Sequence, residues 1–384
     1  TEDSFADENT MPGRLYSYAV QSVDLDGNVS SLSATLSIVP AGKITEDIVW
    51  RTSWSPISIN GDLIVPVGRT LTIEPGTTVR FSSVDEGKTG YRPDVCELIV
   101  EGTLLAAGSE NMPIRFISAA ALAGKTDWDG IRMIPAAGQS QSALKYLVLA
   151  GAEKGLTLYN GDYVAENITA RYCQRGVVLQ GASGTSLLNL NFEDCDYAFT
   201  AESTWNCRLE TLQVRAGRVG VSLAGNSNFS LSDFDIRNVR EVAARVVDRS
   251  SPKLRNGLLH SMQTGLSIGG CSGDHQYLTI DALAGILVDG ADTQTIKNCI
   301  IVNLQLPGTG YGIEEKTGGR SYAYNNIFGF MQATRYCDQL GAPVVNADPR
   351  FVGGSEYDYH LRPDSPLVAA SDSNGQPGAY GSDR

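Results

Sequence analysis

The sequence predicts an all-β fold, a parallel β-helix in which the chain winds as a solenoid with coils of about 22 residues. A small residue recurs at nearly constant spacing between Ser142 and Ile313. Short segments with apolar residues at every second position flank these markers, which is the pattern of strands with one buried face. No stretch sustains the i, i+3, i+4, i+7 apolar pattern of a helix, so helical solenoids are disfavoured.

The recurring small residues define the period. They are Gly155, Gly176, Ala198, Gly220, Ala243, Gly265, Gly285 and Gly312, which lie 21, 22, 22, 23, 22, 20 and 27 residues apart. Inward positions before and after the second marker are apolar, as Ile168 and Ala170, then Val177 and Leu179. A single coil cannot bury this inward face, so each coil depends on stacking against the next one.

Several runs carry a resemblance to a known superfamily. They are 61–66 (GDLIVP), 71–77 (LTIEPGT), 113–116 (PIRF), 128–132 (WDGIR), 144–146 (LKY), 347–352 (ADPRFV) and 358–363 (DYHLRP). These runs resemble the opening and closing coils of secreted bacterial right-handed parallel β-helix proteins of the pectate-lyase-like superfamily. The resemblance implies a right-handed solenoid over residues 45–384, with an N-terminal cap and a closing coil, in an extracellular or cell-surface protein. It leaves function open, because the superfamily includes lyases, hydrolases, epimerases, adhesins and structural stalks.

Residues 1–44 are expected to form a small antiparallel β fragment. The run 14–28 (RLYSYAVQSVDLDGN) is similar to the last part of a fibronectin type III domain, with Tyr16 and Tyr18 on a strand. Because the earlier strands of such a domain are missing, an open apolar face remains. The fragment is expected either to pack against the first coil near Trp50 or to belong to a longer chain or assembly.

Asp24, Asp26 and Asn28 have two possible roles. Asp-Gly favours a hairpin turn, and calcium coordination is the alternative, although the run is too short for an EF-hand loop. No other cofactor is indicated.

Composition excludes some partners. The net charge is −13 and no Lys/Arg cluster is present, so nucleic acid is an improbable partner. The acidity favours solubility, with cation binding or repulsion of an acidic polymer as the alternative. No apolar stretch approaches the ~20 residues that span a bilayer.

The chain has seven cysteines, an odd number, so at least one is unpaired within the chain. Cys173 and Cys195 are 22 residues apart and should stack on adjacent coils, about 4.8 Å apart. A buried ladder of unlinked thiols is favoured, and a disulfide stays open. No Cys-x-x-Cys motif or histidine spacing predicts a metal site.

Outward-facing residues form two polar columns. One holds Arg171, Glu193, Arg215 and Arg237, and the next holds Thr169, Asn191, Gln213 and Asp235. Such a wall is suited to gripping a sugar polymer. Opposite charges on neighbouring strands also stabilise a sheet by roughly 0.2–1 kcal/mol per pair without any function, and that structural role is favoured. Tyr159 and Tyr163 are expected as an exposed aromatic pair for a carbohydrate.

A polysaccharide lyase or epimerase needs convergent acids and bases. The candidates are Asp194 and Asp196, Asp233 and Asp235 about two coils later, and His260. The motif sets of polygalacturonases and mannuronan epimerases are absent, and so is a GxSxG nucleophile elbow.

Three functions follow as hypotheses. The favoured one is an extracellular or cell-surface binding or structural module that contacts polysaccharide or a surface protein without catalysis. The second is a polysaccharide lyase, hydrolase or epimerase with an acidic site. The third is a scaffold subunit of a surface assembly.

Overall fold

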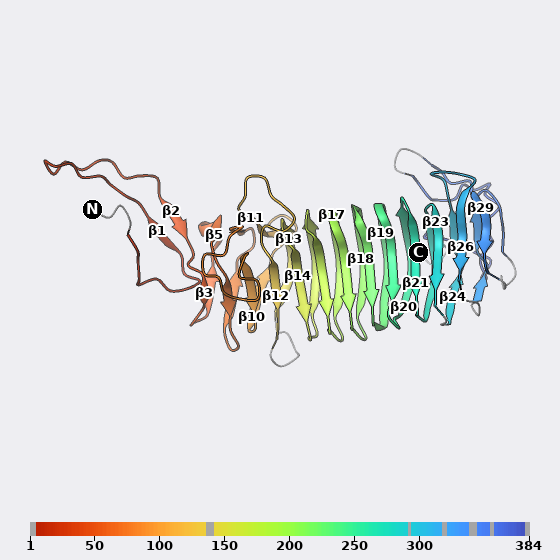
Figure 1. Cartoon of the computed structure of the whole chain (residues 1–384), viewed down its shortest axis with the longest axis horizontal. Coiled ribbons are helices and arrows are strands. Elements are labelled where there is room, and N and C mark those ends of the chain that lie inside the picture. The colour runs from red at the N-terminus through yellow and green to blue at the C-terminus, as the bar shows by residue number, and fades with distance from the viewer. Residues whose placement is uncertain are drawn as a thin grey trace.

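In the computed structural model the chain forms an elongated solenoid of parallel strands with a hairpin at its N-terminal end (Figure 1). The structure describes residues 5–135, 142–290, 293–316, 321–337, 344–353 and 357–380. The predicted all-β parallel β-helix is confirmed, since β3 to β29 belong to one sheet and helical structure in the described residues is confined to a 3-10 turn at Thr52–Trp54. No helix of these residues is long and apolar enough to cross a membrane.

The strands follow one another around the coils. The hairpin is β1 (Tyr16–Tyr18) and β2 (Leu36–Ile38). The first coils are built from β3 (Gly42–Lys43), β4 (Ile48–Trp50), β5 (Ile57–Ile59), β6 (Leu63–Val65), β7 (Thr70–Ile73), β8 (Thr78–Phe81), β9 (Glu97–Val100), β10 (Thr103–Ala107), β11 (Ile114–Ser118) and β12 (Gly130–Met133). The central coils are β13 (Ala143–Ala150), β14 (Lys154–Tyr159), β15 (Val164–Arg171), β16 (Arg175–Gln180), β17 (Ser186–Glu202), β18 (Arg208–Ala224), β19 (Ser227–Val247) and β20 (Ser251–Ser261). The last coils are β21 (Thr264–Gly269), β22 (Gly273–Asp281), β23 (Ala284–Asp289), β24 (Gln294–Lys297), β25 (Ile300–Val302), β26 (Thr309–Glu315), β27 (Ser321–Ala323), β28 (Asn326–Phe328) and β29 (Phe330–Arg335).

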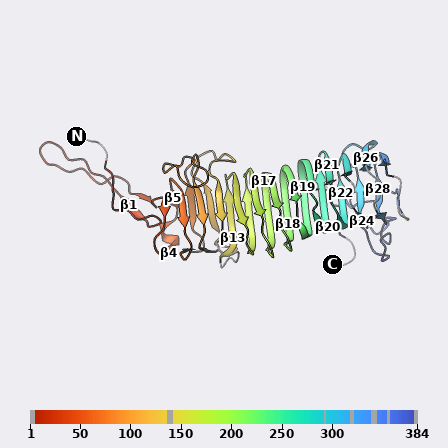
Figure 2. The same ribbon diagram turned by 60° about the horizontal axis from the view of Figure 1, so that its bottom comes forward.

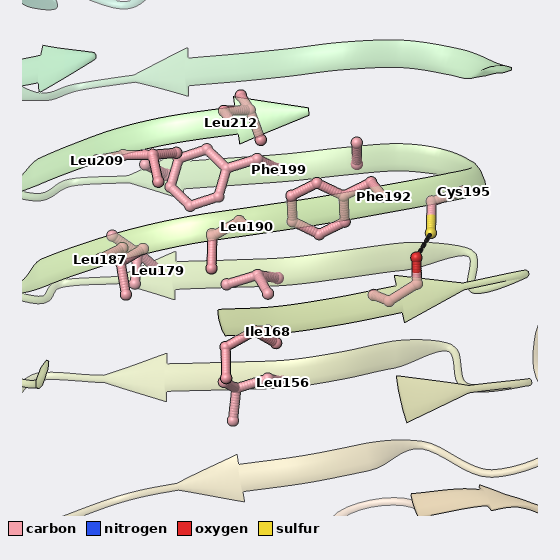
Figure 3. Packing of buried hydrophobic residues seen from close by; sticks show 14 of the residues in the cluster. Leu156, Ile168, Leu179, Leu187, Leu190, Phe192, Cys195, Phe199, Leu209 and Leu212 are labelled. Carbon is pink, nitrogen blue, oxygen red and sulfur yellow. Dashed lines mark hydrogen bonds between the residues drawn. The ribbon is translucent and has the colours of Figure 1, made fainter. Parts of the chain in front are cut away.

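Parallel pairing between coils places apolar residues of adjacent coils on top of one another. Ile168 pairs with Leu190 and Leu190 pairs with Leu212. All three are fully buried, and Figure 3 shows this stack beside Phe192 and Phe199. The inward positions predicted from the alternation are therefore the core of the solenoid.

The recurring small residues have a steric reason. A Cβ atom on Gly176 would lie 2.4 Å from the ring of Phe192, and one on Gly220 would lie 2.6 Å from Cγ2 of Ile236. Large side chains of the next half-coil thus pack directly over these positions. The small residues recur once per coil because a larger side chain at these positions would collide with the core.

The bend between two faces of each coil is a second periodic feature. The residues there have positive φ angles of 51° to 60°, as for Asn167 (57°), Asn189 (57°), Thr211 (60°) and Asp233 (56°). Asn and Asp tolerate this left-handed conformation better than most residues. The bend interrupts the alternation, because the buried residues on either side of it, such as Leu187 and Leu190, are three positions apart. This bend was not identified from the sequence.

The N-terminal hairpin is anchored at its base and extends away from the solenoid (Figures 1 and 2). The indole of Trp50 donates to the carbonyl of Gly13 (2.9 Å), so the expected contact near Trp50 is present. Farther out, Val20 and Leu25 are 72% and 107% exposed. The paired part of the hairpin is short, since Leu36–Ile38 pairs with Tyr16–Tyr18 over three residues.

The tip of the hairpin is a turn. Both carboxylate oxygens of Asp24 accept hydrogen bonds from within it, Oδ1 from the backbone N–H groups of Asp26 and Asn28 and Oδ2 from the Asn28 side chain. The turn prediction is confirmed. In the described part of the chain, no group of three His, Cys, Asp or Glu side chains is arranged to hold a metal ion.

The two stacked cysteines are free thiols in a buried position. The thiol of Cys195 lies 3.5 Å from the carbonyl of Ala170 (Figure 3), and Asp196 N–H donates to the carbonyl of Cys173 (3.1 Å). The structure thus corresponds to the unlinked ladder.

We expect the substitution Phe192→Ala to lower the free energy of unfolding by roughly 3–5 kcal/mol, because it opens a cavity in the stacked core. Leu188→Ala, on the same strand β17 but 41% exposed, is the control and should change stability by less than about 1 kcal/mol. Urea unfolding followed by circular dichroism measures both. Equal losses for the two variants would show that this stack does not stabilise the solenoid.

Candidate functional site

A groove runs along one outward face of the central coils. Its floor includes the second predicted column, whose register is confirmed: Thr169 pairs with Asn191, Asn191 with Gln213, and Gln213 with Asp235. The bend residues, among them Asn167 and Asn189, border this column. The groove therefore follows from the coil register.

Two cavities make up this groove. One, of about 540 Å³, is lined by Glu110, Pro113, Tyr146, Leu147, Val148, Asn167, Thr169, Asn189, Asn191 and Gln213. The other, of about 550 Å³, is lined by Thr211, Leu212, Gln213, Asp233, Phe234, Asp235, Asn256, Leu258, Ala379 and Tyr380. Both include Gln213 and both follow the column from Thr169 to Asp235, so the two cavities adjoin. Together we call them the amide groove.

The charged column beside the groove also has the predicted register. Arg171 pairs with Glu193, Glu193 with Arg215, and Arg215 with Arg237. The guanidinium of Arg171 lies 3.0 Å from the carboxylate of Glu193. These charges are paired within the wall, as the structural interpretation requires, and a ligand role for them stays a prediction.

Asp235 is held between two arginines. The Arg215 guanidinium donates to both of its carboxylate oxygens (3.2 and 3.1 Å), and Arg237 Nε donates to Oδ1 (2.7 Å). The carboxylate lines the groove, but its charge is compensated. Asp233 lines the same cavity from the bend.

The candidate base His260 is covered. It is 6% exposed, its Nδ1 accepts the backbone N–H of Asn238 (3.0 Å), and its ring stacks on Tyr357 with 5.6 Å between centroids. Burial lowers the pKa of the imidazole below its ordinary value. His260 does not line the amide groove.

Behind His260 lies a buried acid that the sequence analysis missed. Asp281 pairs in register with His260 and is fully buried. Its carboxylate accepts the hydroxyl of Tyr359 (2.7 Å) and the backbone N–H of Leu304 (3.0 Å). Burial raises the pKa of Asp281.

The four candidate aspartates do not meet in one site. Asp194 lies at the bend that follows Glu193, and its carboxylate and that of Asp196 both bind Nζ of Lys125, at 3.2 and 2.9 Å. Neither lines the groove that Asp233 and Asp235 line. The structure thus separates the two pairs that a single acidic site would need.

The expectation of an exposed pair Tyr159 and Tyr163 is wrong. Tyr163 is 2% exposed, and its hydroxyl donates to the carbonyl of Tyr159 (2.7 Å). Tyr159 accepts a hydrogen bond from Arg132 (2.8 Å) at the edge of a buried cluster. The position of Tyr163 beside a turn predicts exposure. In the structure its ring packs inward and its hydroxyl donates to backbone carbonyls.

The C-terminal segment forms the end wall of the groove. Ala379 N–H donates to Thr279 Oγ1 (2.9 Å), and Gly378 N–H donates to the carbonyl of Asn298 (2.8 Å). Leu258, which continues the groove column after Asp235, packs with Tyr359 and Ala379. In this column the polar Asp235 is followed by the apolar Leu258. This change in the sequence could have predicted that another segment covers the column from Leu258 on.

A second charged cluster is buried beneath residues 82–96. Arg132 donates to Glu97 (3.1 Å) and to Asp129 (2.8 Å), while Asp62 accepts the backbone N–H of Glu97 (2.8 Å) and the hydroxyl of Thr89 (2.9 Å). Burial raises the pKa of Asp62 to about 6 and also raises the pKa of Glu97. These contacts fasten residues 82–96 to the coils, a structural role.

A comparison with protein-family models agrees with the fold. A family model described as a right-handed beta helix region matches residues 154–329. Among solved structures, the chain is similar to a variant of the catalytic domain of GH87 alpha-1,3-glucanase in complex with tetrasaccharides, with 12% identity and a TM-score of 0.32. The match covers 81% of this chain and 63% of that one, so this chain spans less than two thirds of its length. At this TM-score the likeness carries no argument about function. No curated protein matches.

The buried acid Asp62 makes a stability prediction with a defined sign. Its pKa rises from an ordinary value of 3.8 to about 6 in the folded protein. Between these values the folded protein binds more protons than the unfolded chain, so this group lowers stability as the pH rises from about 4 to about 6. Asp62→Asn removes the charge and keeps an oxygen for Glu97 N–H. We expect a higher melting temperature than wild type at pH 7 and no gain at pH 4.

The measurement is the difference in melting temperature between Asp62→Asn and wild type from pH 4 to pH 8. The difference cancels the opposite titration of buried His275, whose pKa is lowered to about 4. Asp26→Asn, at an exposed position of the hairpin, is the control and should show no pH-dependent difference. A constant difference between Asp62→Asn and wild type at every pH would contradict the account.

Proposed function

We propose that this chain is an extracellular or cell-surface protein that binds a polysaccharide in the amide groove without cleaving it. One observation carries the proposal: an outward groove of two adjoining cavities, along which the polar residues Thr169, Asn191 and Gln213 follow one another at one per coil. Neighbouring strands lie about 4.8 Å apart, so polar side chains recur at that interval along the groove. The repeating units of a polysaccharide would therefore find polar side chains at regular intervals along the groove.

The groove chemistry suits hydroxyl groups. Each side-chain amide carries two N–H donors and an acceptor oxygen, so it pairs with a sugar hydroxyl in either direction. Asn189 Nδ2 donates to Asn167 Oδ1 (2.5 Å), which orients these two amides on adjacent coils. Pre-oriented groups lose less conformational entropy on binding. Tyr146 adds an aromatic ring at the bend.

The acids argue against catalysis as the leading function. Both oxygens of Asp235 accept hydrogen bonds from arginines, and Asp194 and Asp196 share Lys125. A general acid or base has to exchange protons with the substrate. Cleavage is the second candidate function, because Asp233 and Asp235 both line the groove.

We expect the double substitution Asn191→Ala and Gln213→Ala to weaken polysaccharide binding by roughly 2- to 12-fold for each hydrogen bond lost. Ser222→Ala, on the later half of strand β18 and outside the groove, is the matched control and should bind like wild type. Affinity electrophoresis against a panel of neutral and acidic polysaccharides, with calcium or with a chelator, measures binding. The same mixtures are assayed for reducing ends and for unsaturated uronate.

Outcomes separate the functions. Retardation without product, lost in the double variant, supports the proposal. Product from any polymer would make the protein an enzyme and direct mutagenesis to Asp233 and Asp235. If no polysaccharide retards the protein, the groove is not a carbohydrate site, and a scaffold role in a surface assembly becomes the better account.

A further inference from the structure

The amide groove is closed at one end. Along its column, Asp235 is followed by Leu258 and then Thr279. Leu258 packs with Ala379, and Thr279 accepts the backbone N–H of Ala379. Ala379 and Tyr380 therefore occupy the path that an extended ligand would follow beyond Asn256.

This end wall is fixed from several sides. The ring of Tyr380 stacks on His360 with 3.9 Å between centroids, and its hydroxyl accepts from Arg237 (3.4 Å). Upstream, Asp372 binds Nζ of Lys297 (2.9 Å) and the side chain of Asn298 (2.9 Å). The segment is thus attached to the coils through the side chains of Asp372 and Tyr380.

The groove also lacks a cation for an acidic sugar. Its lining contains the acids Glu110, Asp233 and Asp235 and no Lys or Arg. The guanidinium groups of Arg215 and Arg237, which lie beside Asp235, are bound to its carboxylate. The net charge of −13 adds long-range repulsion of anionic polymers.

We propose that the amide groove binds the terminal segment of a neutral glycan chain, with the chain end placed against Tyr380. The inference rests on the proposed function and names its ligand class. A ligand lying on the coils ends where the wall stands, because the floor beyond it is buried. The open stretch from the Tyr146 coil to the Asn256 coil spans five coil steps, roughly 24 Å at the spacing of adjacent strands.

The test uses neutral hexasaccharides of glucose, mannose, xylose and galactose, with hexagalacturonate as the acidic probe, in isothermal titration of the full chain. For the best neutral binder, chains of increasing length and a cyclic form with the same linkage are compared. End recognition predicts equal affinity per mole of chain and no binding of the cyclic form. The apparent affinity per gram then falls in proportion to chain length.

Two variants locate the end. Tyr380→Ala removes the ring that the end wall presents to the groove, while Ala379 still covers Leu258, so the preference for chain ends over internal segments should weaken. Tyr380→Phe keeps the ring and should retain the preference of wild type for chain ends, which controls for disturbance of the C-terminal segment.

Failures of the two proposals are distinguishable. Binding that scales with mass, or a cyclic glycan that binds wild type as well as the linear one, overturns end recognition and leaves polysaccharide binding intact. Tightest binding of hexagalacturonate overturns the neutral ligand class alone. If none of the probes binds, both this inference and the proposed function fall.

Discussion

The core and the outward groove of the solenoid both depend on the parallel backbone pairing that places each residue beside the one about 22 positions earlier, as Gln213 beside Asn191. This pairing satisfies the N–H and C=O groups of adjacent coils, stacks Leu190 on Ile168 in the core, and aligns the amides of the groove outside. Because side chains alternate along a strand, a slip of one residue would exchange the inward and outward sets. Core and groove therefore share one register, and neither can change alone.

The groove combines this periodic floor with one non-periodic element, the C-terminal segment that ends the groove at Ala379 and Tyr380. Charges are arranged to hold the framework. Asp235 is compensated by Arg215 and Arg237, Lys125 links Asp194 and Asp196, and Arg132 joins Glu97 to Asp129. What the groove offers a ligand is mainly amides and hydroxyls. The N-terminal hairpin, whose base is bonded to Trp50, lies at the opposite end of the solenoid from the C-terminal segment and takes no part in this site.

The local periodicity of the sequence is enough to predict most of the fold. The markers Gly176 and Gly220, the inward strands and both polar columns follow from spacing alone, since equivalent positions of a solenoid recur at the coil length. The bends at Asn167 and Asn189 leave only a small mark in the sequence, a spacing of three instead of two between buried residues such as Leu187 and Leu190, and they were missed. The burial of Tyr163, the acid cluster around Asp62 and the wall at Tyr380 depend on contacts between segments distant in sequence, for which spacing holds no signal. The site was therefore predictable in its periodic part only.

Removing one coil tests the shared register most directly. A variant lacking residues 192–213, the 22 residues that bring Asn191 onto the position of Gln213, should keep the strands aligned and melt cooperatively close to wild type. A variant lacking only residues 192–212 places Gln213 at the inward position of Phe192 and should be far less stable. Thermal unfolding by far-ultraviolet circular dichroism compares the two. The account predicts that only the first variant keeps a melting temperature near that of wild type. Equal melting temperatures for both variants would contradict it.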